Sequence, residues 1–150
     1  MRDKLIAITP DKWGLLEALG KSNILNMQSL KAIVHDIANT RIEVAEEYYN
    51  AAKMLLENNI HDRSVISRAY YSMYHAARTV VYIKMRLDVQ EHKKLIKKFK
   101  KVLIKEYNDY TLSTLMEDWR MERNLPDNDL CNHAVEDCKS IIEFCKNIIK

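Results

Sequence analysis

The chain has 150 residues, of which 47% are hydrophobic and 30% are charged, so it is long enough for one domain with a hydrophobic core and too apolar to be disordered. Two glycines and two prolines are too few for the many tight turns of a β-rich fold, which excludes that class and predicts an all-α fold. The net charge of +3 is mild, so an acidic partner is expected only where the basic residues are concentrated.

The first part of the chain predicts one short helix and one long helical segment. In residues 1–27 the apolar residues recur least regularly, and we expect only a short helix there, from about Asp11 to Leu19. From Ser29 the apolar residues recur at steps of three and four, a helical pattern that continues to Asn58. Asn39-Thr40 is a candidate break or cap that would divide this segment into two helices.

Three further helical segments follow before a predicted turn. They run from about Asp62 to Arg86, from Glu91 to Glu106, and from Leu112 to near Asn124. Because proline disfavours helical geometry in the residue before it, Pro126 predicts that the chain turns at Leu125.

The final helix has the clearest pattern of all. Asp127, Asn128 or Asp129 can cap its start. Its apolar residues repeat with a period near 3.5, the seam expected in a helical bundle, and include Cys131, Ala134, Val135, Cys138, Ile141, Ile142, Cys145, Ile148 and Ile149. The three cysteines lie two helical turns apart, about 10 Å of rise, which is too far for one metal ion or for disulfides within the helix. We therefore expect buried thiols and a reducing cytoplasm.

One segment carries the excess of positive charge. Residues 91–107 contain seven lysines and two glutamates, and the lysines lie opposite the apolar side of a predicted amphipathic helix. Such a face can bind the phosphates of a nucleic acid, and a merely solvated helix face is the alternative. The candidate nucleic-acid-binding residues are Lys94, Lys97, Lys98, Lys101 and Arg120.

Membrane, metal and cofactor binding are not expected. No apolar run approaches the roughly 18 residues of a membrane span, so we expect a soluble cytoplasmic protein. The chain also lacks the Glu-x-x-His pairs of a di-iron bundle and a glycine-rich phosphate loop.

The tyrosine-rich segment Ser67–Arg78 closely resembles a signature helix of archaeal and bacterial HEPN proteins (higher eukaryotes and prokaryotes nucleotide-binding). Ala45–Leu56 is similar to that family's first bundle helix, and Ala134–Ile148 is similar to its last. The likeness spans about residues 41–150, the expected HEPN-like bundle, and leaves residues 1–40 as an N-terminal helical extension of one compact domain. The signature-helix residues are Arg68, Tyr70, Tyr71 and His75. The resemblance implies a homodimer and an antiparallel up-and-down bundle of four to five long helices.

The resemblance implies two kinds of function. Some HEPN proteins are ribonuclease toxins that pair with a minimal nucleotidyltransferase antitoxin, and others are non-catalytic modules that bind nucleotides or RNA. Catalytic members carry an arginine, then four to six residues, then a histidine, where one bundle helix turns into the last.

At the matching junction the arginine is present and the histidine is absent. Arg123-Asn124 matches the start of the motif, but positions 128–130 hold no histidine, and His133 is ten residues beyond Arg123. A positioned proton donor or acceptor contributes roughly 10²- to 10⁴-fold to such a cleavage, and histidine is the residue that serves near neutral pH. We therefore predict a non-catalytic module that binds RNA or nucleotide and associates with a nucleotidyltransferase in a toxin–antitoxin-like pair.

Two alternatives stay open at this point. The first is a metal-independent endoribonuclease with a degenerate site, and its candidate catalytic residues are Arg123, Asn124 and Asp127, with His133 as an additional imidazole. The second is a scaffold that only oligomerises. Arg68 and His75 also fit the motif spacing, but they lie about 10 Å apart on one helix, and we expect His75 to pack at the edge of the bundle.

Overall fold

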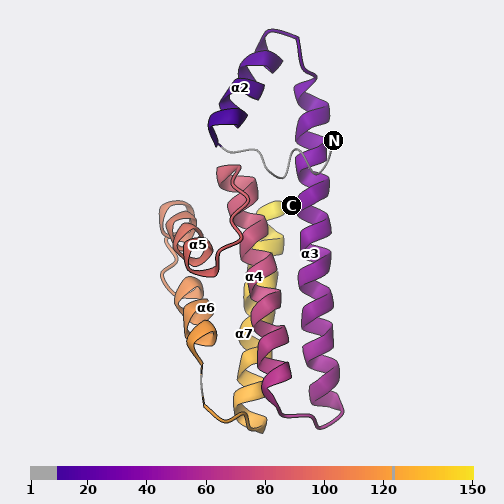
Figure 1. Cartoon of the computed structure of the whole chain (residues 1–150), viewed down its shortest axis with the longest axis vertical. Helices are drawn as coiled ribbons and strands as arrows, with labels where there is room; N and C mark the ends of the chain where they lie inside the picture. The colour runs from indigo at the N-terminus through magenta and orange to yellow at the C-terminus, as the bar shows by residue number, and fades with distance from the viewer. Residues whose placement is uncertain (1–9, 123) are drawn as a thin grey trace.

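The structure is a computed structural model that describes residues 10–122 and 124–150. These ranges contain helices and no strand, which confirms the all-α prediction. The helices are α2 (Pro10–Lys21), α3 (Met27–Glu57), α4 (Arg63–Met85), α5 (His92–Tyr107), α6 (Leu112–Met121) and α7 (Asn128–Ile149). Figure 1 shows α3, α4 and α7 side by side. Helices α5 and α6 together take the position of a fourth helix in an up-and-down bundle.

Helix α3 is continuous, so the predicted break at Asn39-Thr40 is wrong. The Thr40 hydroxyl donates a hydrogen bond to the Asp36 carbonyl at 3.0 Å, and the Asn39 amide lies 3.1 Å from Nδ1 of His35. Each polar side chain finds its partner one turn earlier in the same helix, so neither needs to interrupt it. The helix therefore also passes without interruption through the expected boundary after residue 40.

Helix α4 lies at the centre of the main core. Its small residues Ala69, Ala76 and Ala77 are fully buried, which allows the neighbouring backbones to approach closely. The seam of α7 packs against the same core, and all three of its cysteines are buried with free thiols, as predicted. On another side of α4, Tyr70, Tyr71 and Tyr74 contact rings from α3 and α5.

A second, smaller hydrophobic core packs α2 against α3 and α4. Trp13 of α2 packs with Val34 and Ile37 of α3 and with Tyr82 of α4. The guanidinium carbon of Arg86 lies 4.6 Å from the centre of the Trp13 ring. Figure 1 shows α2 beside the end of α3 that extends beyond α4.

The connection from α4 to α5 is held in place by a buried ion-pair network. Asp88 lies in this connection, with only 7% of its side chain exposed, between Arg78 of α4 and Arg41 of α3. Arg78 donates two hydrogen bonds to the Asp88 carboxylate, at 2.8 and 2.9 Å, and Arg41 lies 2.9 Å from one of its oxygens. The network fixes where α5 begins, because Asp88 is only four residues before His92.

No helix in the described part of the chain has the length and apolar character that a membrane crossing demands.

Candidate functional site

The α6–α7 junction, where the motif was predicted, is built as a helix stop followed by a helix cap. Helix α6 ends at Met121, and Glu122 accepts a hydrogen bond from the backbone N–H of Asn124 at 2.7 Å. Asp127 then caps α7, since its Oδ1 accepts from the backbone N–H of Leu130 at 2.8 Å. The cap prediction for Asp127 is confirmed, and this carboxylate already has a structural partner.

The other residues of the predicted catalytic set are not brought together by a described contact. Arg123 lies outside the described residues, so its contacts are not part of this structure. Asn124 and His133 are both exposed. His133, on α7, has no hydrogen bond or ion pair with a described residue. The interpretation of Arg123, Asn124 and Asp127 as a site therefore stays a prediction.

Arg120 lies beside a pocket between α4 and α6. The pocket has a volume of about 210 Å³ and is lined by Arg63, Ile66, Ser67, Tyr70, Trp119, Arg120 and Glu122. Arg120 donates two hydrogen bonds of 2.8 Å to the carboxylate of Glu117, and these bonds lower the pKa of Glu117 and raise that of Arg120. Arg120 thus belongs to an ion pair on α6, and its predicted role in binding nucleic acid stays a prediction.

The structure reveals one functional candidate that the sequence analysis missed, His92. The hydroxyl of Tyr70 lies 2.6 Å from Nδ1 of His92, and their rings are stacked with centroids 5.5 Å apart. Burial, with a smaller contribution from Arg120, lowers the pKa of His92, and burial raises the pKa of Tyr70. Both groups are therefore neutral near pH 7. The only sequence signal was a histidine directly before the lysine run, and nothing in the sequence linked it to a tyrosine 22 residues earlier.

Tyr70 and His92 belong to a cluster of aromatic rings along α4. We call this the aromatic cluster, and its members are Tyr48, Tyr70, Tyr71, Tyr74, His75 and His92. Three of the four predicted signature-helix residues lie in it. The fourth, Arg68, is exposed and directs one N–H to the Ser64 carbonyl at 3.4 Å. The sequence indicated the tyrosines, and the structure adds Tyr48 from α3 and His92 from α5.

His75 packs at the edge of the bundle, where it stacks on Tyr48 with ring centroids 5.4 Å apart. Burial is the main cause that lowers its pKa, and the charges of Arg78 and Arg41 act in the same direction. The formal Arg68–His75 match therefore consists of two residues with separate contacts on one continuous helix.

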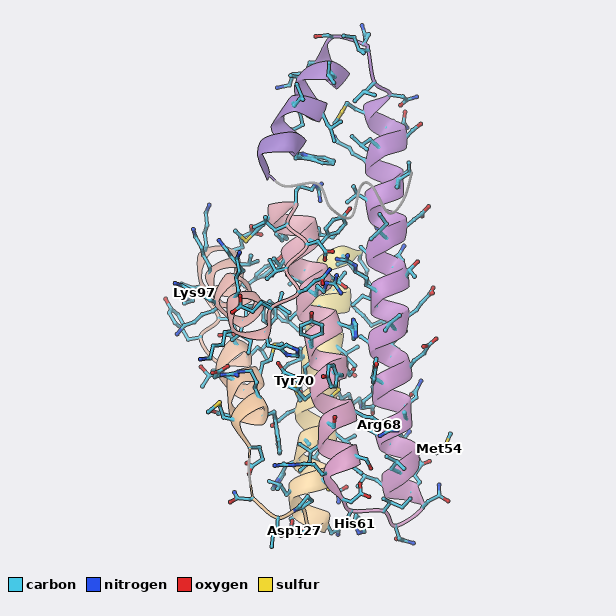
Figure 2. The ribbon with its side chains drawn as sticks, in the orientation of Figure 1. Met54, His61, Arg68, Tyr70, Lys97 and Asp127 are labelled. Carbon is cyan, nitrogen blue, oxygen red and sulfur yellow. The ribbon has the colours of Figure 1, made fainter. Side chains whose placement is uncertain are left out.

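The lysines of α5 point away from the bundle, and Figure 2 shows Lys97 on the outer side of this helix. A shallow groove of about 550 Å³ is lined by Lys94, Lys97, Lys98, Lys100, Lys101 and Ile104, and we call its five lysines the lysine face. None of the five makes an ion pair within the described part of the chain. The opposite side of α5 buries Leu95, Phe99 and Leu103, so the amphipathic prediction is confirmed. The positive charge of this face is available to an external anion.

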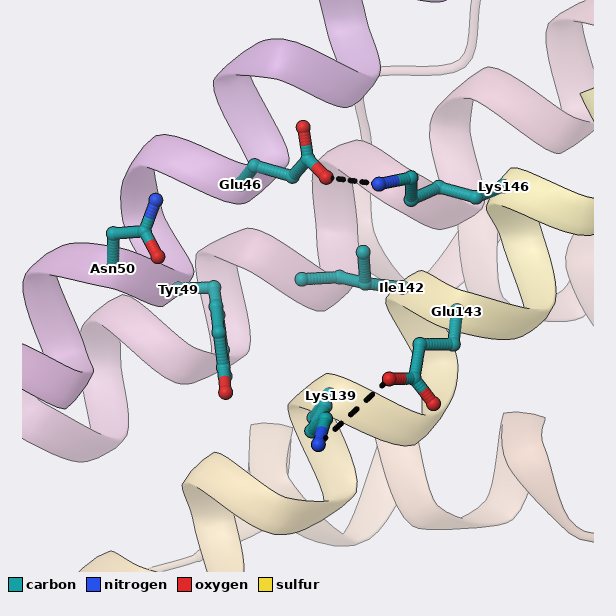
Figure 3. Close-up of a pocket in the computed structure, with 7 residues that line it drawn as sticks. All are labelled: Glu46, Tyr49, Asn50, Lys139, Ile142, Glu143 and Lys146. Carbon is teal, nitrogen blue, oxygen red and sulfur yellow. Dashed lines mark hydrogen bonds and ion pairs between the residues drawn. The ribbon is translucent and has the colours of Figure 1, made fainter.

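A second groove, between α3 and α7, has balanced charges. Its volume is about 330 Å³, and it is lined by Glu46, Tyr49, Asn50, Lys139, Ile142, Glu143 and Lys146 (Figure 3). Glu46 pairs with Lys146 across the groove, and Lys139 lies 3.9 Å from Glu143. Each lysine thus has a glutamate nearby, and the groove offers no surplus charge.

Among the described residues, no group of His, Cys, Asp and Glu is arranged to hold a metal ion.

Comparison with known proteins gives one family match and two relatives. The family model described as "HEPN domain" matches residues 38–150. A Methanocaldococcus jannaschii protein named "Putative toxin" is 41% identical over 58 residues, which cover 39% of this chain and 42% of that protein. A Pyrococcus horikoshii protein named as a UPF0332 protein is 43% identical over 58 residues, or 39% of each chain. The aligned part thus spans about two-fifths of each relative, and no solved structure matches.

Proposed function

The chain belongs to the HEPN family, and from this premise we propose that it is a non-catalytic module that binds RNA through the lysine face of α5. The proposal includes a homodimer and a partner nucleotidyltransferase in a toxin–antitoxin-like pair, as the family resemblance implies. The toxin name of the Methanocaldococcus jannaschii relative supports the general setting.

The lysine face is the observation that carries the proposal. Its five lysines line one groove, and no carboxylate of the described residues pairs with their ammonium groups. The other side of α5 packs into the core, so the helix presents all five lysines on one exposed side. Neutralising phosphates with such an array releases counterions, and this release is the main source of affinity for a nucleic-acid backbone.

The contacts of two of the five histidines, His75 and His92, support the absence of catalysis. His92 shares its Nδ1 with the hydroxyl of Tyr70, and His75 is stacked on Tyr48. A general base must reach the proton that it removes, at roughly 2.6–3.2 Å. Both rings lie within the aromatic cluster, where each already has a tyrosine partner.

A salt-dependence experiment tests the RNA proposal. Binding of labelled RNA is measured by fluorescence anisotropy at several salt concentrations, with Lys94, Lys97, Lys98 and Lys101 all changed to Gln. We expect weaker binding and a slope of log K against log salt that is shallower by up to about three, since each phosphate contact on a single strand contributes about −0.7.

The matched control removes the same charge elsewhere on the surface, by changing Lys31, Lys53, Lys139 and Lys150 to Gln. This control is expected to keep most of the affinity and slope. Equal losses in both variants, or no binding by the unaltered protein, would contradict the proposal.

Co-purification of the tagged chain with a co-expressed nucleotidyltransferase tests the proposed partner protein. The lack of any stable complex would count against that partner.

A ribonuclease toxin is the second candidate function, favoured by the name of the Methanocaldococcus jannaschii relative. It would use Arg123 to neutralise the scissile phosphate, with Asn124, Asp127 and His133 as the remaining candidates. Growth arrest on expression that Arg123→Ala relieves would favour this function over the first.

A further inference from the structure

The most exposed ring of the aromatic cluster is also the one with the most ring neighbours. Tyr71 is 40% exposed. Its ring is stacked beside that of Tyr48, with 5.9 Å between the ring centroids. It also meets three rings edge-on, with centroid distances of 5.9 Å to Tyr70, 6.3 Å to Tyr74 and 5.9 Å to His92. Four neighbouring rings therefore hold Tyr71 in one orientation while a large part of it faces solvent. Its hydroxyl makes no hydrogen bond to a described residue.

The neighbours of Tyr71 are themselves fixed to the protein. Tyr70 is bonded to His92, and the Tyr74 hydroxyl donates to the Gln90 carbonyl at 2.7 Å. Gln90 lies two residues after Asp88, which Arg41 of α3 and Arg78 of α4 hold in place by ion pairs. The cluster is thus rigid before any ligand arrives, so little conformational entropy is lost when a flat group stacks on it.

The aromatic cluster and the lysine face share helix α5. His92 is the first residue of α5, and Lys93 and Lys94 follow it at once. On the other side, Arg68 lies three residues before Tyr71 on α4, is exposed, and makes no ion pair with a described residue. Both helices thus carry cations close in sequence to Tyr71 or to its ring neighbour His92.

We propose that Tyr71 is a stacking site for an unpaired base of single-stranded RNA whose phosphates lie on the lysine face. This inference rests on the proposed RNA binding and specifies the form of the RNA. Proteins that bind single strands combine a basic groove along the backbone with aromatic rings on which bases stack. The bases of a duplex are stacked on one another and cannot reach such a ring, so the site selects single strands.

Binding of a single-stranded oligoadenylate, measured by anisotropy, tests the inference with three variants. Tyr71→Ala is expected to weaken binding by about 5- to 150-fold, the effect of losing one stacked base. Tyr71→Phe keeps the ring and is expected to bind within about twofold of the unaltered protein. Tyr110→Ala removes a tyrosine that is 58% exposed and has no aromatic neighbour among the described residues, and it is expected to have no effect. The slope of log K against log salt stays unchanged in all three, because no charge is lost.

A second readout uses the unaltered protein, so it does not depend on how the variants fold. An oligoadenylate that carries 2-aminopurine is expected to lose fluorescence on binding, because a stacked 2-aminopurine is quenched. No quenching at any labelled position would overturn the inference.

The remaining outcomes separate this inference from the proposed function. If the unaltered protein and Tyr71→Ala bind RNA equally and only the lysine variant is weak, the stacking site is wrong and RNA binding stands. If the unaltered protein binds no RNA, both are wrong. If Tyr71→Ala keeps its RNA affinity but halves the mass in light scattering, Tyr71 is a contact between two copies of the chain, and the inference is overturned.

Discussion

The hydroxyl of Tyr70 on α4 lies 2.6 Å from Nδ1 of His92, the first residue of α5. The bond spans 22 residues of sequence and a connection that Asp88 holds in place. It brings a ring from the lysine helix into the tyrosine cluster, so the two surfaces that carry the functional proposals share α5.

Two histidines of this cluster make stability depend on pH. Burial is the first cause of the lowered pKa of both His75 and His92, relative to an ordinary value of 6.5. In the window below about 6.5 the unfolded chain therefore binds more protons than the folded one, and the free energy of unfolding falls as the pH falls. Thermal melts between pH 7.5 and 5 (roughly the range in which histidine titrates) should show a decreasing melting temperature.

Changing His75 and His92 to Gln should flatten this pH dependence. The exposed His133 supplies the control, since His133→Gln should leave the dependence as it was. A dependence that survives the double change would place its origin in other groups.

The cysteines of α7 should be inert in the folded protein. Burial raises the pKa of Cys138 to about 12, and it also raises the pKa of Cys131 and Cys145. Because the thiolate is the reactive form, a thiol reagent at neutral pH should modify none of them in the native state and all three after denaturation. Rapid native modification of one cysteine, measured by mass spectrometry, would show that α7 opens locally.

The burial of these cysteines was predictable because it follows from helical periodicity alone. The same reasoning predicted α4, α5 and α7 to within a residue or two, and the outward side of the lysine helix. It also predicted a cap at Asp127, Asn128 or Asp129, of which the structure has Asp127. Each of these features depends on residues that are close in sequence.

The features that sequence reasoning missed depend on contacts between distant segments. Nothing local indicates that His92 meets Tyr70, because the path between them is set by Asp88 and two arginines from different helices. The opposite error occurred at Asn39-Thr40, where two polar residues suggested a break but are satisfied within α3.

Asp88 should be among the most sensitive positions in the chain. The side chains of Asp88, Arg41 and Arg78 are only 7%, 11% and 16% exposed. Removing the carboxylate in Asp88→Ala leaves two nearly buried guanidinium groups uncompensated, which should lower the free energy of unfolding by about 3–5 kcal/mol. Urea unfolding measures the loss.

An exposed ion pair provides the comparison for Asp88. Glu106 pairs with Lys84 at 2.8 Å on the surface, and Glu106→Gln should cost less than about 1 kcal/mol. Losses of similar size in the two variants would mean that the buried network contributes no more than a surface pair.

Asp127 should act on stability through its capping bond. Asp127→Ala removes the acceptor for the N–H of Leu130 and should cost about 1 kcal/mol, measured by urea unfolding. Asp127→Asn keeps an acceptor without the carboxylate, so its stability should match that of the unaltered protein. If RNA cleavage were present and lost in Asp127→Asn at full stability, the carboxylate would have a chemical role beyond the cap.

The most direct test of the account follows the binding and the integrity of one RNA in the same tube. Labelled single-stranded RNA is incubated with the purified protein between pH 5.5 and 8.5 (about the range over which an imidazole could relay protons) and examined by gel retardation and by denaturing gel. We expect a retarded complex whose RNA stays full length at every pH, for the unaltered protein and for Arg123→Ala alike. Cleavage that disappears in Arg123→Ala, or the absence of a complex, would contradict it.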